Sequence, residues 1–158
     1  MAENPQRAES ARYRVRNIHH VGITVAQLER SLAFYRDLLG MGIIGISDDE
    51  DVSVIVGLPG ARVRIADLDA GNGQLLELIE YDSAIGDGSG PNRVGSCHLS
   101  LQVDDLRLTL SRLANADVRP VGEPTRLSAS GVWQGCTVVY LRDPDGVIVE
   151  LLERGSDG

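Results

Sequence analysis

Two segments of the chain share one alternating pattern, and this internal repeat limits the folds that the sequence can adopt. Residues 20–25 and 97–103 each alternate apolar side chains with polar ones, as a half-buried β-strand does. The polar side of each segment carries a histidine, His20 in the first and His98 in the second. The leucines eight and twelve residues after each histidine recur as well, namely Leu28, Leu32, Leu106 and Leu110. The sequence therefore predicts a duplicated unit in which a strand precedes a helix.

The remaining segments complete two similar halves. In the first half we expect a strand over 17–25, a helix over 26–39, and strands over 52–58, 61–68 and 74–81. In the second half we expect a strand over 97–103, a helix over 104–114, and strands over 135–142 and 147–153. These elements predict an α+β fold of two βαβββ modules, with helices on one face of the strands and polar side chains on the other.

Composition shifts along the chain suggest where the modules begin and end. Residues 1–14 are polar and charged, which predicts a disordered tail. The first module is expected over 15–82 and the second over 96–154. Between them, residues 83–95 are rich in glycine and predict a linker. At 158 residues the two modules are expected to form one structural domain.

Charge and cysteine content narrow the possible partners and compartment. The formal net charge of −8 argues against a general affinity for nucleic acid or an anionic membrane surface, so a small molecule is the expected partner. No segment approaches the roughly 18 apolar residues that a membrane helix needs. The two cysteines lie in apolar strand patterns, a usage typical of a reducing compartment. We therefore expect a cytoplasmic protein.

The last predicted strand of each half contains a glutamate flanked by apolar residues. By alternation, Glu150 shares the polar face with His98, and Glu77 has the equivalent place relative to His20. A single histidine or glutamate of this kind is usually hydrogen-bonded or solvated, but here the same pair occurs in both halves. Burying such groups is costly unless they are paired or bind a metal, so the four predict a divalent metal site. By the same parity, the adjacent His19 falls on the opposite face and is interpreted as structural.

Four further residues are candidates for contacts with a substrate. Arg64 is either solvated or holds an anionic substrate group. Trp133, the only tryptophan, closes over either a substrate or the core. Ser100 and Tyr140 complete the predicted substrate-binding set.

Several longer motifs resemble the vicinal oxygen chelate superfamily, which includes glyoxalase I, methylmalonyl-CoA epimerase, extradiol dioxygenases, and fosfomycin and bleomycin resistance proteins. The segments that carry the resemblance are 20–25, 31–40, 76–81, 97–99 and 143–151. The resemblance implies paired βαβββ modules that form a curled mixed sheet around a metal cavity, usually in a homodimer. The positions that match the family's metal ligands are His20, Glu77, His98 and Glu150.

The presence of Glu77 makes the chain most similar to the glyoxalase I and methylmalonyl-CoA epimerase branch. That resemblance implies a lyase, isomerase or epimerase that abstracts a proton next to a carbonyl, with the enediolate stabilised on one divalent metal ion. Glu150 is the first candidate for the catalytic base and Glu77 the second. Zn, Ni, Co, Mn and Fe all suit the predicted nitrogen and oxygen ligands.

Two alternatives to this function stay open. One is an Fe(II)-dependent dioxygenase, in which one of the two carboxylates would take no part in the reaction. The other is a non-catalytic drug-binding or metabolite-binding protein, such as a resistance protein.

Overall fold

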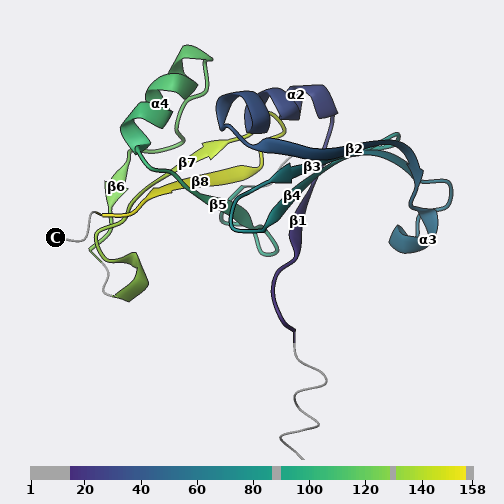
Figure 1. The fold of residues 1–158 in the computed structure, drawn as a ribbon, viewed down its shortest axis with the longest axis horizontal. Coiled ribbons are helices and arrows are strands. Elements are labelled where there is room, and N and C mark those ends of the chain that lie inside the picture. Colours follow the sequence, from purple (N-terminus) through teal and green to yellow (C-terminus); the bar gives the residue numbers. More distant parts are fainter. Residues whose placement is uncertain (1–14, 87–89, 129–130, 156–158) are drawn as a thin grey trace, which may run out of the picture.

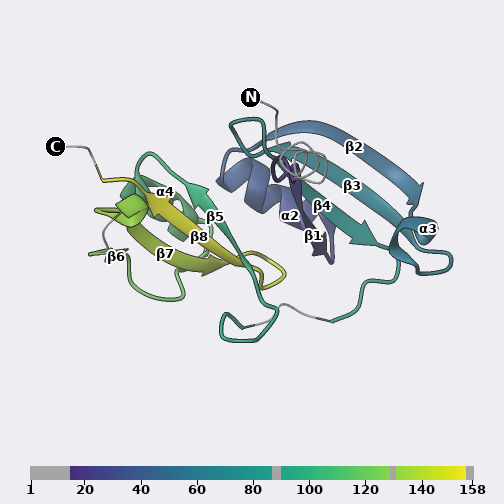
Figure 2. The same ribbon diagram turned by 90° about the horizontal axis from the view of Figure 1, so that it is seen from below.

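The computed structural model describes residues 15–86, 90–128 and 131–155. The expected tail over 1–14 lies outside these residues, as does part of the expected linker. Within the described parts, the strands form two separate four-stranded mixed sheets, which lie side by side (Figure 2). This confirms the predicted α+β fold class.

The first sheet is built by the first half of the chain. Its strand order is β1-β4-β3-β2, where β1 and β4 are parallel and the other neighbours are antiparallel. The strands are β1 (His20–Val25), β2 (Gly42–Asp51), β3 (Arg62–Asp69) and β4 (Leu75–Tyr81).

The second sheet repeats this topology with the second half of the chain. Its order is β5-β8-β7-β6, again with one parallel pair, β5 with β8. The strands are β5 (His98–Gln102), β6 (Thr125–Arg126), β7 (Thr137–Arg142) and β8 (Ile148–Glu153). The predicted duplication therefore exists in three dimensions, although β6 is only two residues long.

The helices α2 and α4, one from each half, lie on the same side of the sheets (Figure 1). The helical elements are α2 (Leu28–Leu32), the π-helical turn η1 (Ala33–Leu38), α3 (Ser53–Val56), α4 (Leu106–Asn115) and the 3₁₀ turn η2 (Gly131–Trp133). The apolar faces of α2, η1 and α4 pack on the sheets in one buried cluster, which includes Leu28, Tyr35, Leu78, Leu113 and Leu151. The two halves thus share a core.

The repeat extends to the way each helix begins. Glu80 of β4 accepts a hydrogen bond of 2.5 Å from the backbone N–H of Leu28, and Glu153 of β8 accepts one of 2.5 Å from the N–H of Leu106. A carboxylate at a helix N-terminus satisfies an N–H that has no partner within the helix, and it interacts favourably with the helix dipole. Both glutamates stand three residues after a candidate site glutamate, on the face that the helices cover.

One predicted strand, over 52–58, is wrong. The edge strand β2 lies earlier, at Gly42–Asp51, and residues Ser53–Val56 form the short helix α3 instead. Asp51 ends the strand, because its Oδ1 accepts hydrogen bonds from the backbone N–H and the hydroxyl of Ser53 at 3.0 and 2.5 Å. The β-branched residues of 52–58 suggested a strand, but Val54 and Ile55 are exposed and lack the packing that gives such residues their strand preference.

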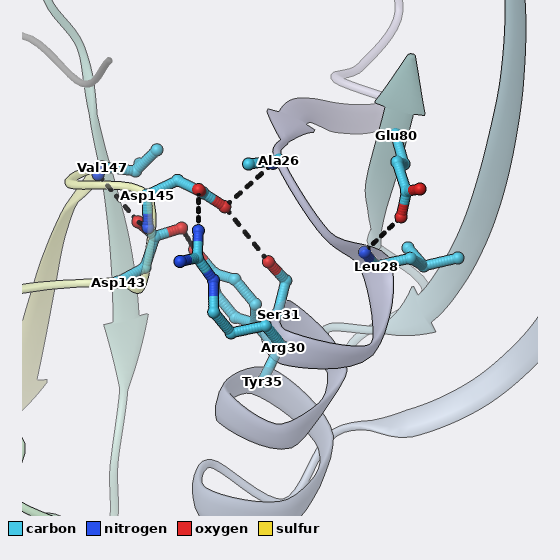
Figure 3. A network of polar contacts seen from close by, with 9 residues as sticks. All are labelled: Ala26, Leu28, Arg30, Ser31, Tyr35, Glu80, Asp143, Asp145 and Val147. Atoms are coloured by element: carbon cyan, nitrogen blue, oxygen red, sulfur yellow. Dashed lines mark hydrogen bonds and ion pairs between the residues drawn. The ribbon is translucent and has the colours of Figure 1, made fainter. Parts of the chain in front are cut away.

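A buried polar network joins the two halves, as Figure 3 shows. Tyr35 of η1 donates a hydrogen bond of 2.9 Å to Asp143, in the turn between β7 and β8, and both side chains are buried. Asp143 also accepts from the backbone N–H groups of Asp145 and Val147 at 2.9 and 2.8 Å. Burial raises the pKa of Asp143, and burial together with the charge of Asp143 raises the pKa of Tyr35.

The turn between β7 and β8 also contacts the start of helix α2. Asp145 pairs with Arg30 and accepts a hydrogen bond of 3.2 Å from the backbone N–H of Ala26. The turn of the second half is therefore tied to α2 and η1 of the first half. Asp143 and Asp145 contribute to the junction between the halves.

Within the described ranges, no helix has the length and apolar character needed to cross a membrane.

Candidate functional site

The candidate residues lie on the sheet faces that the helices leave open. In β4, Leu76 and Leu78 belong to the shared core, so Glu77 between them projects to the opposite face. In β8, Val149 and Leu151 belong to the same core, so Glu150 is likewise on the open face. We call these surfaces the open faces of the first and second sheets.

In the first sheet the histidine and the glutamate are close. The Nε2 atom of His20 lies 4.0 Å from Oε2 of Glu77, with side-chain exposures of 47% and 25%. Gly22 is the neighbour of Glu77 across the parallel strands β1 and β4. A Cβ atom at Gly22 would lie 3.5 Å from Oε2 of Glu77, so the glycine leaves space beside this carboxylate.

His19 contacts His20, although strand alternation had predicted His19 to lie on the opposite face. It precedes β1, and its Nδ1 lies 3.0 Å from Nδ1 of His20. One of these nitrogens carries the proton of the hydrogen bond. His20 therefore has one ring nitrogen engaged by His19 and the other directed toward Glu77.

In the second sheet the glutamate has a different partner. Glu150 is buried, with 9% of the residue exposed, and its Oε1 accepts a hydrogen bond of 2.5 Å from the hydroxyl of Ser100. The two residues are neighbours across the parallel strands β5 and β8. Ser100 was predicted to contact the substrate, and in the structure it contacts Glu150, a candidate metal-binding residue.

Tyr140 completes this part of the second open face. It is the neighbour of Glu150 across β7 and β8, and its ring packs on the ring of His98 with 5.3 Å between centroids. Burial, and to a lesser degree the charge of Glu150, raises the pKa of Tyr140, so its hydroxyl stays protonated at neutral pH.

Arg64 occupies a different environment from the one predicted for a substrate contact. It lies on the helix-covered face of β3, where its guanidinium pairs with three carboxylates: Glu29 at 2.7 Å, Asp48 at 2.8 Å and Glu80 at 3.6 Å. The hydrogen bonds to Glu29 and Asp48 raise the pKa of Arg64. This residue therefore links α2, β2 and β4, and its charge is already compensated.

The open face of the second sheet carries another arginine that the sequence reasoning missed. Arg142 of β7 lies in line with His98 across β8, because both residues are in register with Ile148. Its guanidinium donates a hydrogen bond of 2.8 Å to the carbonyl of Gly146, and among the described residues no carboxylate lies within ion-pair distance of it. The alternation of β7 could have identified it.

Trp133 lies in η2 and is 47% exposed, so it is not part of the core. No contact in the described chain relates it to the other candidates.

The structure brings His20 and Glu77 close together, whereas His98 and Glu150 share the open face of the second sheet two register positions apart. Over the described ranges of one chain, no group of three or more His, Cys, Asp or Glu side chains is close enough to hold a metal ion. Two donors about 2.1 Å from one tetrahedral metal lie about 3.4 Å apart, so the His20–Glu77 pair, at 4.0 Å, would close by about half an ångström around an ion. Imidazole and carboxylate are also donors that first-row divalent metals accept.

The fold and the paired histidine and glutamate residues define a class of small α+β proteins built from two βαβββ modules. The family model described as the glyoxalase/bleomycin resistance protein/dioxygenase superfamily matches residues 17–151. The chain belongs to this superfamily, as the resemblance in its motifs implied.

Two kinds of enzyme occur among the similar proteins. The chain is 30% identical over 139 residues to human mitochondrial methylmalonyl-CoA epimerase, covering 85% of this chain and 72% of that one. It is 29% identical over 140 residues to lactoylglutathione lyase of Haemophilus influenzae, covering 88% and 93%.

Solved structures share the fold. A glyoxalase family protein from Bacillus cereus superposes with a TM-score of 0.81 at 23% identity, covering 92% of this chain and 99% of that one. Glyoxalase I of Leishmania major gives a TM-score of 0.62 at 22% identity, covering 88% and 87%.

Proposed function

We propose that the chain is a metal-dependent lyase, isomerase or epimerase that removes a proton from the carbon next to a substrate carbonyl. One observation carries the proposal: both sheets place a histidine from the first strand and a glutamate from the parallel neighbouring strand on the open face. The relatives named as an epimerase and a lyase support the same reaction class.

His20, Glu77, His98 and Glu150 are the residues that would hold one divalent ion. When bound, such an ion supplies Lewis-acid stabilisation of the negative charge that develops on a substrate oxygen. Zn, Ni, Co, Mn and Fe remain the candidates, since the donor set suits each of them.

The chain's own residues perform the proton transfer. Glu150 is the first candidate for the base, and only 9% of the residue is exposed. Glu77 is the second candidate. We assign to the neutral hydroxyl of Tyr140 a hydrogen bond to a substrate oxygen. Arg142 takes the role that the sequence suggested for Arg64, holding an anionic group of the substrate.

We propose that a second copy of the chain completes the site. The two pairs do not form one cluster within a single chain, so a four-ligand site needs the first half of one chain and the second half of its partner. Such a homodimer has two equivalent sites related by its symmetry axis.

Mixing two variants tests this arrangement. His20→Ala removes a ligand from the first half of the chain, and His98→Ala removes one from the second half. Neither homodimer therefore has an intact site. After the two proteins are mixed and allowed to exchange subunits, one composite site per heterodimer regains both halves. Recovery of metal binding in the mixture is the expected result, and no recovery despite confirmed subunit exchange would contradict it.

The reaction class is tested by hydrogen exchange in deuterated water. Methylmalonyl-CoA and lactoylglutathione serve as trial substrates, because each has a hydrogen on the carbon next to its thioester carbonyl. We expect mass spectrometry to show enzyme-dependent deuterium uptake at that carbon, at the same rate with and without dioxygen. Oxygen consumption that matches product formation would instead indicate a dioxygenase. Stoichiometric ligand binding without exchange would indicate a binding protein.

A further inference from the structure

Ser100 and Gly22 occupy equivalent places in the two sheets but present different groups to their glutamates. In the parallel pairing of β1 with β4, Gly22 is the neighbour of Glu77. In the parallel pairing of β5 with β8, Ser100 is the neighbour of Glu150. The duplication thus gives one candidate carboxylate a hydroxyl beside it and gives the other a glycine.

The hydroxyl has a specific geometric effect. The bond from the Ser100 hydroxyl to Oε1 of Glu150 measures 2.5 Å, at the short end of the range for O–H···O hydrogen bonds. Oε1 is thereby engaged, while Oε2 has no hydrogen bond from the described residues. Because Glu150 is also buried, its rotamer is held from two sides, by packing and by the hydroxyl.

We propose that Ser100 is a positioning residue that fixes Glu150 with Oε2 presented to the site. The inference rests on the proposed function, since it concerns the carboxylate assigned as the first candidate for the base. A residue that orients a ligand or a base through a hydrogen bond typically changes metal affinity or activity by about 10- to 100-fold when it is removed. Ser100 therefore acts on the reaction through Glu150.

Glu77 provides the internal contrast. Its neighbour Gly22 on β1 offers no hydrogen-bonding side chain, its neighbour on β3 is the carboxylate Asp67, and Nε2 of His20 lies 4.0 Å away. The carboxylate of Glu77 is consequently less restrained, and its orientation depends on what binds between it and His20. The two glutamates thus have different constraints at equivalent positions.

The test compares Ser100→Ala with Ser100→Thr, with Ser111→Ala at an exposed position of helix α4 as the control. For each variant, isothermal titration with Co²⁺ measures affinity, and the visible spectrum of the Co²⁺ form reports the geometry of its ligands. Thermal unfolding of the metal-free proteins checks the fold. We expect Ser100→Ala to weaken Co²⁺ binding about 10- to 100-fold and to change the spectrum. Ser100→Thr, which keeps the hydroxyl, should restore both, and Ser111→Ala should change neither.

The outcome is separable from that of the proposed function. If no substrate shows exchange, the proposed function fails, yet altered Co²⁺ affinity and spectrum in Ser100→Ala would still support the positioning role. If Ser100→Ala matches the unchanged protein in affinity and spectrum, the positioning role is overturned even when exchange occurs. A loss that Ser100→Thr does not restore would also overturn it, because the role requires the hydroxyl.

Discussion

The two halves of the chain have the same strand order but different surroundings for their candidate glutamates. In the first sheet, Glu77 is only partly buried and faces His20 across a gap beside a glycine. In the second sheet, Glu150 is buried and hydrogen-bonded by Ser100. Duplication therefore determines where a functional group stands, whereas the neighbouring residues determine how mobile and how accessible it is.

The histidines differ in a complementary way. His20 is hydrogen-bonded by the preceding His19, while His98 packs on the ring of Tyr140. In the first half a side-chain hydrogen bond engages the imidazole, and in the second half one engages the carboxylate. This contrast leads us to expect that the halves contribute unequally to catalysis.

The largest expected effect comes from exchanging each carboxylate for an amide. Glu150→Gln keeps the size and one oxygen but lacks a base, so we expect the α-hydrogen exchange rate to fall about 10²- to 10⁴-fold. Glu77→Gln should reduce the rate less, because Glu150 still carries the proton. Rates are compared at matched metal occupancy. Equal losses in both variants would mean that the contrast between the halves has no catalytic consequence.

The junction between the halves gives the next largest effect. Tyr35→Phe removes the donor to buried Asp143, and hydrogen bonds to charged groups contribute roughly 1.5–3 kcal/mol. We expect the free energy of unfolding in urea to fall by that amount. Tyr81→Phe, on a partly buried tyrosine of β4, serves as the control and should change it by less. If the Tyr35→Phe variant is as stable as the unchanged protein, the hydrogen bond between Tyr35 and Asp143 does not stabilise the junction between the halves.

The pH dependence of stability follows from the same junction. Burial raises the pKa of Asp143 above its ordinary value of 3.8, so the folded protein holds this proton at pH values where the unfolded chain has released it. The stability from that proton is fully present below pH 3.8 and is lost as the pH rises through the raised pKa. Asp143→Asn cannot titrate, so its unfolding free energy should lack this decline. A parallel pH profile in both proteins would contradict the assignment.

A smaller effect is expected from the two arginines. Arg142→Gln should raise KM for an anionic substrate severalfold with little change in kcat, since it removes binding that is the same in the ground and transition states. Arg64→Gln should leave KM unchanged and lower stability, because Arg64 pairs with Glu29, Asp48 and Glu80. If Arg64→Gln instead raises KM and Arg142→Gln does not, Arg64 is the arginine that contacts the substrate.

Alternation and spacing were sufficient to predict most of the fold. The repeated histidine strands and the helices that follow them were identified because their apolar residues face a core. Strand β2 was missed because glycine and acidic residues, which strands generally disfavour, make up much of its sequence. The two-residue strand β6 is too short to produce a pattern.

The site was predictable in its positions but not in its contacts. Parity placed Glu77 and Glu150 on the open faces, yet the bond between Ser100 and Glu150 depends on the register of strands separated by most of the second half. The partners of Arg64 also come from three different elements, which no local pattern reveals. His19 was placed on the opposite face because it was assigned to the strand, whereas β1 begins at His20.

Metal binding by the purified chain tests the central claim most directly, namely that the paired histidines and glutamates form one metal site. Protein prepared without chelator is titrated with Zn²⁺, and the stoichiometry is compared among the unchanged protein, His20→Ala, His98→Ala and Ser111→Ala. The account predicts one ion per chain for the unchanged protein and for Ser111→Ala, and loss of stoichiometric binding in both histidine variants. Stoichiometric binding that survives both His20→Ala and His98→Ala would contradict it.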